Sequence, residues 1–246
     1  MPQFHNYDAV VLDIEGTTTS IRFVYEVLFP YARQRLRSFL LAHQTEPAVQ
    51  ADLALVRQQA EADLAAGRGA PQLPDANAPD FIDNAVANLI WQMDHDCKTT
   101  GLKGLQGRIW RSGYADGEIR GHVYDDVPDA LRRLQQASCP VYIYSSGSIA
   151  AQKLLFGHSE AGDLLPMLAG HFDTTTGPKK EPQSYTAIAN AIGCSPQRVV
   201  FGTDNPLEAI AARAAGMQVA VFVRPGNPPL PADHDFVTVT SMDDIA

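Results

Sequence analysis

Residues 9–19 read AVVLDIEGTTT, and this stretch predicts both the fold and the place where chemistry is done. Four apolar residues in a row are typical of a strand buried on both faces of a parallel sheet. Asp13 and Glu15 follow at the carboxyl end of that strand, where ligands bind in open α/β sheets. Because side chains alternate along an extended chain, we expect the two carboxylates to point the same way.

Two carboxylates that converge on one point need a partner. They repel each other unless a cation or a shared proton lies between them. Mg²⁺ is the natural cation, because it is a hard ion that takes oxygen ligands. The alternative is a solvent-exposed turn, in which acidic residues are common. This segment alone leaves both interpretations open.

The composition is that of an ordinary globular protein. The chain has 246 residues, of which 45% are hydrophobic and 19% charged, and it is long enough for one large domain or two smaller ones. Its net charge of −9 argues against a nucleic-acid partner, which would need clustered Lys and Arg. A small anionic substrate stays possible, because a few local cations and a metal can outweigh the overall charge.

The cysteines and the apolar runs bear on location. Cys97, Cys139 and Cys194 are scattered and have no metal-binding spacing. An odd set of free thiols is typical of a reducing compartment, and apolar neighbours favour a packing role for the last two. No apolar run reaches the roughly 20 residues that span a bilayer, and residues 1–5 lack a signal-peptide pattern. We therefore expect a cytoplasmic protein with no membrane partner.

The pattern of apolar residues changes twice along the chain. From Phe23 to about Gly113 apolar residues recur at helical spacing, interrupted by a loop over Gly67–Pro79. The predicted helical faces contain Phe29, Leu36, Phe39 and Leu40, then Leu53, Val56 and Leu64, then Ile82, Val86, Leu89, Ile90 and Met93, with further helical positions around Leu102–Trp110. From Val123 onward strands over 141–144, 199–201, 219–223 and 236–239 alternate with helices over 128–136, 148–156, 182–192 and 207–215.

This alternation predicts the fold class. Strands that alternate with helices form a parallel sheet with right-handed crossovers. We expect an α/β protein, with a Rossmann-like parallel sheet core over residues 1–20 and 123–246 and an inserted all-helical cap over residues 21–122. An insertion that follows the first strand directly is well placed to act as a lid that excludes water.

Three later segments carry polar residues that could reach the same edge of the sheet. Ser145, Ser146 and Ser148 precede a helix, where hydroxyl and N–H groups bind phosphate oxygens, although they could instead only cap that helix, as Ser148 is placed to do. Lys179 and Lys180 precede another helix, and a lysine near two carboxylates would neutralise an incoming phosphoryl group. A solvated basic turn is the alternative. Asp204 follows a strand and supplies a third carboxylate.

The order of these segments resembles the four motifs of the haloacid dehalogenase-like superfamily of phosphohydrolases. Glu15 stands where that superfamily usually has Asp, and with the GTTT that follows it resembles one branch, the enolase-phosphatases of methionine salvage. Other stretches similar to that branch are VLFPY at 27–31, LQGRIW at 105–110, YSSGS at 144–148, AQKLLFGH at 151–158 and VRPGN at 223–227. The resemblance covers nearly the whole chain. Ser20 and Gly202 depart from the usual pattern, but neither removes a functional group.

The resemblance implies a covalent mechanism with one Mg²⁺ per chain. Asp13 would attack phosphorus and form an aspartyl-phosphate, and Glu15 would protonate the leaving oxygen and later activate water. The Asp13 and Asp204 carboxylates and the Glu15 main-chain carbonyl would hold the metal, with waters completing its shell.

It also implies how the phosphoryl group is held. Ser145 and Ser146 would bind its oxygens together with Lys179. We prefer Lys179 to Lys180, because a proline three residues later and a tyrosine six residues later match the spacing in the superfamily. Asn205 and Glu208 are further candidates, to orient water or metal from behind the first ligands.

The substrate implied by the resemblance is 2,3-diketo-5-methylthiopentyl-1-phosphate, a small phosphorylated diketo metabolite. It would be enolised and then dephosphorylated to the acireductone 1,2-dihydroxy-3-keto-5-methylthiopentene by a monomeric enzyme. Glu15, Lys179 or a residue of the lid could take the carbon-bound proton, and the sequence does not decide between them. We expect structural roles for His95, His122, His158 and His171.

Other functions remain as alternatives. A general sugar-phosphate phosphatase of the same superfamily would normally keep Asp at the position of Glu15. A mutase would return the phosphate to its product, and a dehalogenase would need neither metal nor a second carboxylate. A silent module that binds phosphorylated metabolites is disfavoured, because Asp13, Lys179 and Asp204 are all present.

Overall fold

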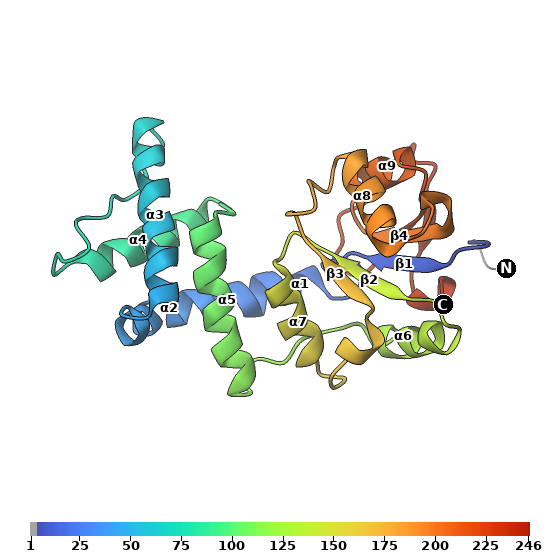
Figure 1. Cartoon of the computed structure of the whole chain (residues 1–246), viewed down its shortest axis with the longest axis horizontal. Helices are drawn as coiled ribbons and strands as arrows, with labels where there is room; N and C mark the ends of the chain where they lie inside the picture. The colour runs from blue at the N-terminus through green and yellow to red at the C-terminus, as the bar shows by residue number, and fades with distance from the viewer. Residues whose placement is uncertain (1–3) are drawn as a thin grey trace. The chain divides into compact units, whose positions relative to one another are not determined.

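The computed structural model describes residues 4–246 (Figure 1), so the prediction for residues 1–5 lies partly outside the described residues. The chain divides into two compact units. The first runs up to Tyr25 and resumes over Arg120–Ala246, and the second is Glu26–Ile119.

Six parallel strands form the sheet of the first unit, in the order β3-β2-β1-β4-β5-β6. They are β1 (Ala9–Leu12), β2 (Val141–Tyr144), β3 (Gly170–Phe172), β4 (Val199–Thr203), β5 (Gln218–Phe222) and β6 (Val237–Val239). The strand order reverses between β1 and β4, and this switch point is where open α/β sheets bind ligands. The predicted Rossmann-like α/β fold is confirmed.

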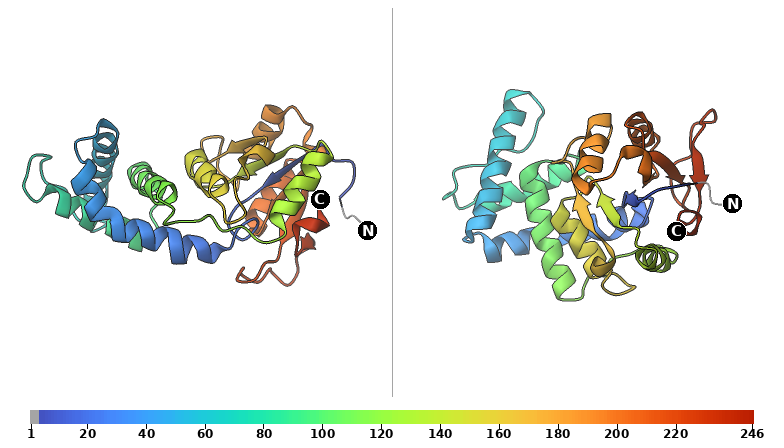
Figure 2. Two further views of the ribbon diagram at one scale, coloured as in Figure 1. Left: turned by 90° about the horizontal axis from the view of Figure 1, so that it is seen from below. Right: turned by 45° about the vertical axis from the view of Figure 1, so that its right-hand side comes forward.

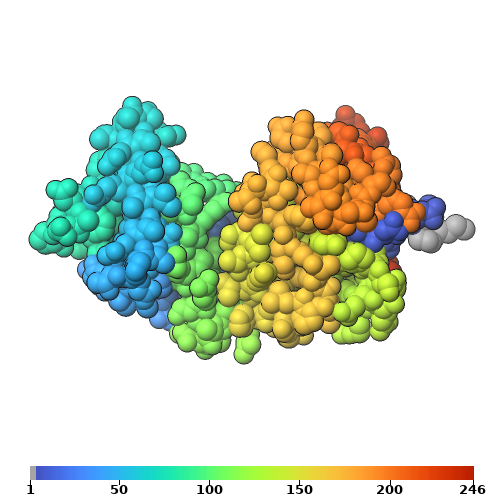
Figure 3. Space-filling view, in the orientation of Figure 1, coloured from blue at the N-terminus to red at the C-terminus, as the bar shows by residue number. Residues whose placement is uncertain are grey.

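Helices cover both faces of this sheet, as Figure 1 shows. On one face lie α6 (Val127–Gln136) and α7 (Ile149–Gly157), and on the other lie α8 (Pro182–Ile192) and α9 (Pro206–Ala214). The outer surface of α8 is seen in orange in the space-filling view (Figure 3). Three single turns, η2 (Leu165–Met167), η3 (Pro196–Arg198) and η4 (Met242–Asp244), complete the unit.

The centre of the sheet is fully apolar. All four residues of β1 are buried, as their composition predicts. Tyr144, Tyr185 and Phe201 pack together between the sheet and α8, with Tyr185 and Phe201 ring centroids 4.9 Å apart. Gly202 leaves room for the neighbouring strand, since a Cβ there would lie 2.8 Å from the Phe222 ring.

The sequence predicts no strand at β3, and this omission is wrong. Residues 170–172 pair in parallel with β2, with Tyr142 opposite Gly170 and Tyr144 opposite Phe172. The strand has three residues, all half-buried, and one is glycine. It therefore lacks the apolar run by which a buried strand is recognised.

The second unit is entirely helical. It contains α2 (Phe29–His43), α3 (Pro47–Ala65), α4 (Phe81–Asp94) and α5 (Thr100–Ala115), coloured blue to green in Figure 2. A short helix, α1 (Ile21–Phe23), and a π-helical turn, η1 (Val24–Leu28), lead into it. Its core gathers apolar residues of all four long helices, among them Leu36, Leu40, Leu53, Val56, Ile82, Leu89, Leu105 and Ile109.

The predicted apolar face of α3 is wrong at its last turn. Leu64 is 61% exposed, whereas Asp63 beside it is buried. Asp63 is buried because Gln59 Nε2 donates to it at 2.7 Å and Arg68 Nε lies 3.0 Å from it. The buried face of α3 thus ends with a paired carboxylate instead of a leucine.

No helix within residues 4–246 combines the length and the apolar character needed to cross a membrane.

Candidate active site

A buried ammonium group lies between two carboxylates at the carboxyl edge of the sheet. Asp13 follows β1 directly, and its N–H donates to the Gly202 carbonyl at 2.8 Å, which fixes the loop against β4. Lys179 Nζ lies 2.5 Å from Asp13 Oδ1 and 2.7 Å from Glu208 Oε2. All three side chains are buried. A buried ion pair of this kind stays together because separating its members would leave a charge in the interior without a partner or water.

The main chain around Lys179 is anchored by three hydroxyl groups. Tyr185 donates to the Lys179 carbonyl at 2.6 Å, Ser184 to the Pro178 carbonyl at 2.7 Å, and Tyr144 to the Gly177 carbonyl at 2.9 Å. Burial alone would lower the pKa of Lys179, but Asp13 and Glu208 outweigh it and raise that pKa above its ordinary value. The neighbouring residue, Lys180, is exposed.

Glu15 and Ser145 are in contact at the same edge of the sheet. Ser145 Oγ donates to Glu15 Oε2 at 3.3 Å and accepts from the Gly147 N–H at 3.1 Å. Burial and then repulsion by Asp13 raise the pKa of Glu15. Ser148, and not Ser145, caps α7, because its hydroxyl accepts from the Ala151 N–H at 3.3 Å. The cap predicted at Ser148 is therefore confirmed.

Asp204 lies at the end of β4, across from the loop that follows β1. Burial and repulsion by Asp13 raise the pKa of Asp204 to about 7. Gly16 makes room for this carboxylate: its φ is +72°, and a Cβ there would lie 2.3 Å from Asp204 Oδ2. Only glycine combines this backbone conformation with so close an approach.

The residues at this edge fit a divalent cation. Four carboxyl groups, those of Asp13, Glu15, Asp204 and Glu208, surround the single ammonium of Lys179, and three of the four have raised pKa values. A hard dication would balance the excess negative charge. Residues 4–246 contain no cluster of three or more His, Cys, Asp or Glu side chains able to hold a metal. The predicted set needs only two side-chain carboxylates, since its third protein ligand is a main-chain carbonyl.

The two further candidates have different contacts from those expected. Asn205 Oδ1 accepts from the Leu207 N–H at 3.0 Å and caps α9. Glu208 contacts Lys179 and also accepts from Thr203 Oγ1 at 2.9 Å. Glu208 therefore positions the Lys179 ammonium. Its place in the first turn of α9, just after the end of β4, could have indicated this contact from the sequence.

Sequence reasoning gave no role to two residues that follow β5. Arg224 Nε donates to the Thr17 carbonyl at 3.2 Å, and Asn227 Nδ2 donates to the Gly16 carbonyl at 2.9 Å. Both hold the loop that carries Asp13 and Glu15. The signal was the Pro-Gly pair between them, which is typical of a type II turn.

Three of the histidines named in the sequence analysis have polar partners. His122 Nδ1 accepts from the Ser20 N–H at 3.2 Å, and His171 Nδ1 lies 3.1 Å from Gln152 Oε1. His95 Nδ1 lies 2.8 Å from the Trp91 carbonyl. The structural roles expected for these histidines stay a prediction.

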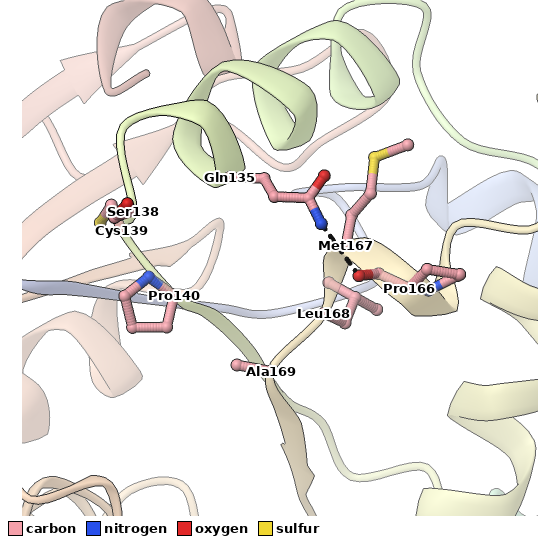
Figure 4. A pocket seen from close by; sticks show the side chains of 8 residues that line it. All are labelled: Gln135, Ser138, Cys139, Pro140, Pro166, Met167, Leu168 and Ala169. Atoms are coloured by element: carbon pink, nitrogen blue, oxygen red, sulfur yellow. Dashed lines mark hydrogen bonds between the residues drawn. The ribbon is translucent and has the colours of Figure 1, made fainter.

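A hollow of about 260 Å³ lies at the opposite edge of the sheet, where β2 and β3 begin (Figure 4). It is lined by Gln135, Ser138, Cys139, Pro140, Pro166, Met167, Leu168 and Ala169. Burial raises the pKa of Cys139 to about 11, so its thiol stays neutral. No other lining side chain is ionisable, so we assign no chemistry to this hollow.

The fold and the site define a class of enzyme. A family model described as haloacid dehalogenase-like hydrolase matches residues 7–216. This range includes Asp13, Lys179 and Asp204. The sheet, its switch point and the carboxylates beside it are thus those of a hydrolase of this class.

Comparison with individual proteins gives the particular family. The chain is 48% identical over 245 residues to Enolase-phosphatase E1 of Synechococcus elongatus, covering 100% of both chains. It is 47% identical over 240 residues to a probable bifunctional methylthioribulose-1-phosphate dehydratase/enolase-phosphatase E1 of Vitis vinifera, covering 96% of this chain and 46% of that protein. The crystal structure of UTR4 protein from Saccharomyces cerevisiae is similar with a TM-score of 0.77 and 33% identity, covering 96% and 98% of the two chains. The chain belongs to the enolase-phosphatase E1 family, and the resemblance seen in the sequence is confirmed.

Proposed function

We propose that this chain is an Mg²⁺-dependent enolase-phosphatase. It converts 2,3-diketo-5-methylthiopentyl-1-phosphate into 1,2-dihydroxy-3-keto-5-methylthiopentene and phosphate, a step of methionine salvage. The observation that carries the proposal is the buried contact of Lys179 with Asp13 at the end of β1, with Glu15 two residues further on. It joins a nucleophile, a cation and a second carboxyl group at one sheet edge.

The proposed diketo phosphate is the product expected of a dehydration reaction that the name of one relative describes. The Vitis vinifera protein is described as joining a methylthioribulose-1-phosphate dehydratase to an enolase-phosphatase in one chain. Loss of water from a ketose phosphate with hydroxyls on C3 and C4 yields a 2,3-diketone that keeps its 1-phosphate. A diketone next to the phosphate-bearing carbon can be enolised there before the ester is cleaved.

Phosphoryl transfer occurs in two steps, through a phosphorylated Asp13. An oxygen of Asp13 forms a bond to phosphorus while the bond to the substrate's ester oxygen breaks, and Glu15 gives that oxygen a proton. Water then attacks phosphorus, Glu15 takes back a proton, and the Asp13–phosphorus bond breaks to release phosphate. The raised pKa of Glu15 supports this role, because burial and the nearby Asp13 make this carboxyl group hold its proton more tightly than a free glutamate does.

The other site residues hold the phosphoryl group and the metal. Ser145 and Ser146 donate to phosphoryl oxygens, and the Lys179 ammonium offsets their charge. The Asp13 and Asp204 carboxylates and the Glu15 carbonyl hold Mg²⁺. When bound, Mg²⁺ supplies positive charge that reduces the repulsion between the nucleophile and the anionic substrate.

The cap extends over residues 21–122 and includes the helical unit, and the core comprises residues 1–20 and 123–246. The cap excludes water from the site, and the chain acts as a cytoplasmic monomer that carries one Mg²⁺. Light scattering combined with metal analysis of the purified chain tests the last two points. A stable dimer, or a metal content far from one per chain, would contradict them.

A time course with the diketo phosphate tests the proposed function. Phosphate release and the absorbance of the enediol are followed together, with Mg²⁺ and with a chelator. We expect both signals only with Mg²⁺, with absorbance leading phosphate. Phosphate without enediol, or release only from simple sugar phosphates, would instead indicate a general phosphatase of the same superfamily.

A further inference from the structure

A tight turn after β5 is hydrogen-bonded to the loop that carries Asp13 and Glu15. The turn spans Arg224–Asn227 and is closed by the Asn227 N–H, which donates to the Arg224 carbonyl at 3.1 Å. Pro225 and Gly226 occupy its central positions, and Gly226 has a φ of +92°, as a type II turn requires. The turn thereby fixes the Asn227 side chain beside Gly16.

The orientation of the Asn227 amide follows from its neighbours. Nδ2 lies 2.9 Å from the Gly16 carbonyl oxygen and 3.2 Å from the Phe222 carbonyl oxygen. A carbonyl can only accept a hydrogen bond, so the NH₂ group must face these two atoms. The amide oxygen, Oδ1, must face the other way.

Asn227 Oδ1 is buried and, within residues 4–246, has no hydrogen-bond partner. A buried acceptor left unpaired costs about 1–3 kcal/mol. The donors that could satisfy it are therefore to be sought outside the polypeptide, in a molecule bound at this point.

The position of Oδ1 indicates which molecule. A Cβ built on Gly16 would lie 2.8 Å from Asn227 Oδ1 and 2.3 Å from Asp204 Oδ2. The amide oxygen and the carboxylate oxygen thus converge on the same side of Gly16. A water bound to Mg²⁺ is a strong donor, and Mg²⁺ in proteins keeps several of its waters.

We propose that Asn227 is a positioning residue of the metal site. Its Nδ2 holds the Gly16 carbonyl in place, and its Oδ1 accepts a hydrogen bond from a water in the shell of Mg²⁺. The inference rests on the proposed function, because it takes Asp13 and Asp204 as the residues that hold the metal. Partners of this kind typically change metal affinity by 10–100-fold when they are lost.

The test is a calorimetric titration of the full chain with MgCl₂ in the absence of substrate. Asn227→Leu removes donor and acceptor, whereas Asn227→Asp removes the donor and keeps an acceptor oxygen. Gln218→Leu is the matched control, because Gln218 Nε2 also donates to two carbonyls, those of His5 at 2.9 Å and Gln197 at 3.0 Å, at the far end of β5. Asp204→Asn tests the metal site itself.

We expect Asn227→Leu to bind Mg²⁺ roughly 10-fold or more weakly than the wild type, with Asn227→Asp and Gln218→Leu close to wild type or tighter. Equal losses in both Asn227 variants would overturn the acceptor role of Oδ1. Wild-type affinity in Asn227→Leu, together with loss of metal binding in Asp204→Asn, would also overturn the inference. The proposed function would stand in that case. If the wild type itself binds no Mg²⁺, the proposed function fails and the inference fails with it. Urea unfolding checks each variant, and Asn227→Ala replaces Asn227→Leu if the latter does not fold.

Discussion

In the described part of the sheet unit, residues 4–25 and 120–246, two cations are buried, and they differ in how their charge is balanced. Arg224 is 7% exposed and Lys179 is 9% exposed. The guanidinium of Arg224 donates to both oxygens of Asp126, at 3.0 and 2.8 Å, and to the Thr240 carbonyl at 2.9 Å. Lys179 has two carboxylates in contact, and two more carboxyl groups lie nearby.

The acids around the two cations respond in opposite directions. Burial would raise the pKa of Asp126, but hydrogen bonds from Arg224 and from the Met242 N–H outweigh it and lower that pKa. Burial and repulsion by Asp13 raise the pKa of Asp204 and of Glu208, each to about 7. Burial alone therefore does not mark a functional site. An excess of one charge in a buried cluster does, because it leaves a charge for a ligand to balance.

The largest effect should come from Asp13→Asn. We expect phosphate release to fall by roughly 10⁴-fold or more, as for the loss of other enzyme nucleophiles. The free energy of unfolding should stay the same or rise, since one of several repelling carboxylates is removed. Stopped phosphate assays and urea unfolding measure the two quantities. Full activity in this variant would exclude a covalent mechanism at Asp13.

Arg224→Met should have the largest effect on stability. Removing the guanidinium leaves Asp126 largely buried without its cation, which typically costs about 3–5 kcal/mol. Urea unfolding measures this loss, and Asp126→Asn, which keeps hydrogen-bonding groups at that position, is the milder comparison. A loss below about 1 kcal/mol would contradict a structural role for this pair.

The contrast between the two cations also shows what the sequence could tell. Asp13, Lys179 and Asp204 each lie at a strand end or before a helix, so a parallel sheet brings them to one edge. The strand ends before Asp13 and Asp204 therefore indicated that these two residues could meet, whereas the choice of Lys179 depended on the resemblance to the superfamily, because β3, the strand before it, was not predicted. Arg224 and Asp126 are 98 residues apart and belong to no strand, so no periodicity predicts that they meet.

Short elements and side-chain orientation were the other limits. β3 has three half-buried residues, and its place in the sheet depends on backbone pairing with β2 and not on its own composition. Leu64 shows the same limit in a helix, because hydrogen bonds to Asp63 decide which side chain is buried there. The unpaired oxygen of Asn227 becomes visible only when its two carbonyl partners are known.

Lys179→Met tests whether the second buried cation acts in catalysis and not only in stability. Loss of a cation that stabilises charge in the transition state should cost about 3 kcal/mol, or roughly 10²-fold in kcat. Because the carboxyl groups around it can take up protons, the free energy of unfolding should fall by less than in Arg224→Met. The same two assays measure both quantities. A variant with near-normal kcat and a large loss of stability would make Lys179 a structural residue like Arg224.

The smallest effect concerns how stability varies with pH in the metal-free protein. The pKa of Glu208 is about 7 in the folded chain and about 4.3 in a free glutamate, so the folded state binds this proton more tightly. The corresponding stabilisation is complete below about pH 4.3 and is lost as the pH rises through 7. Asp126 behaves in the opposite way, because its lowered pKa gives stabilisation above about pH 3.9 that is lost in more acidic solution.

Glu208→Gln should therefore flatten the profile between pH 5 and 8, by about 1–3 kcal/mol across that window. Urea unfolding in a chelator at several pH values measures it, with Asp126→Asn as the matched control that leaves this window unchanged. Added Mg²⁺ should restore stability above pH 7 in the wild type, since a dication favours ionised carboxylates around it. An unchanged slope in Glu208→Gln would mean that the excess charge at this sheet edge is balanced within the polypeptide, and the distinction between the two buried cations would then disappear.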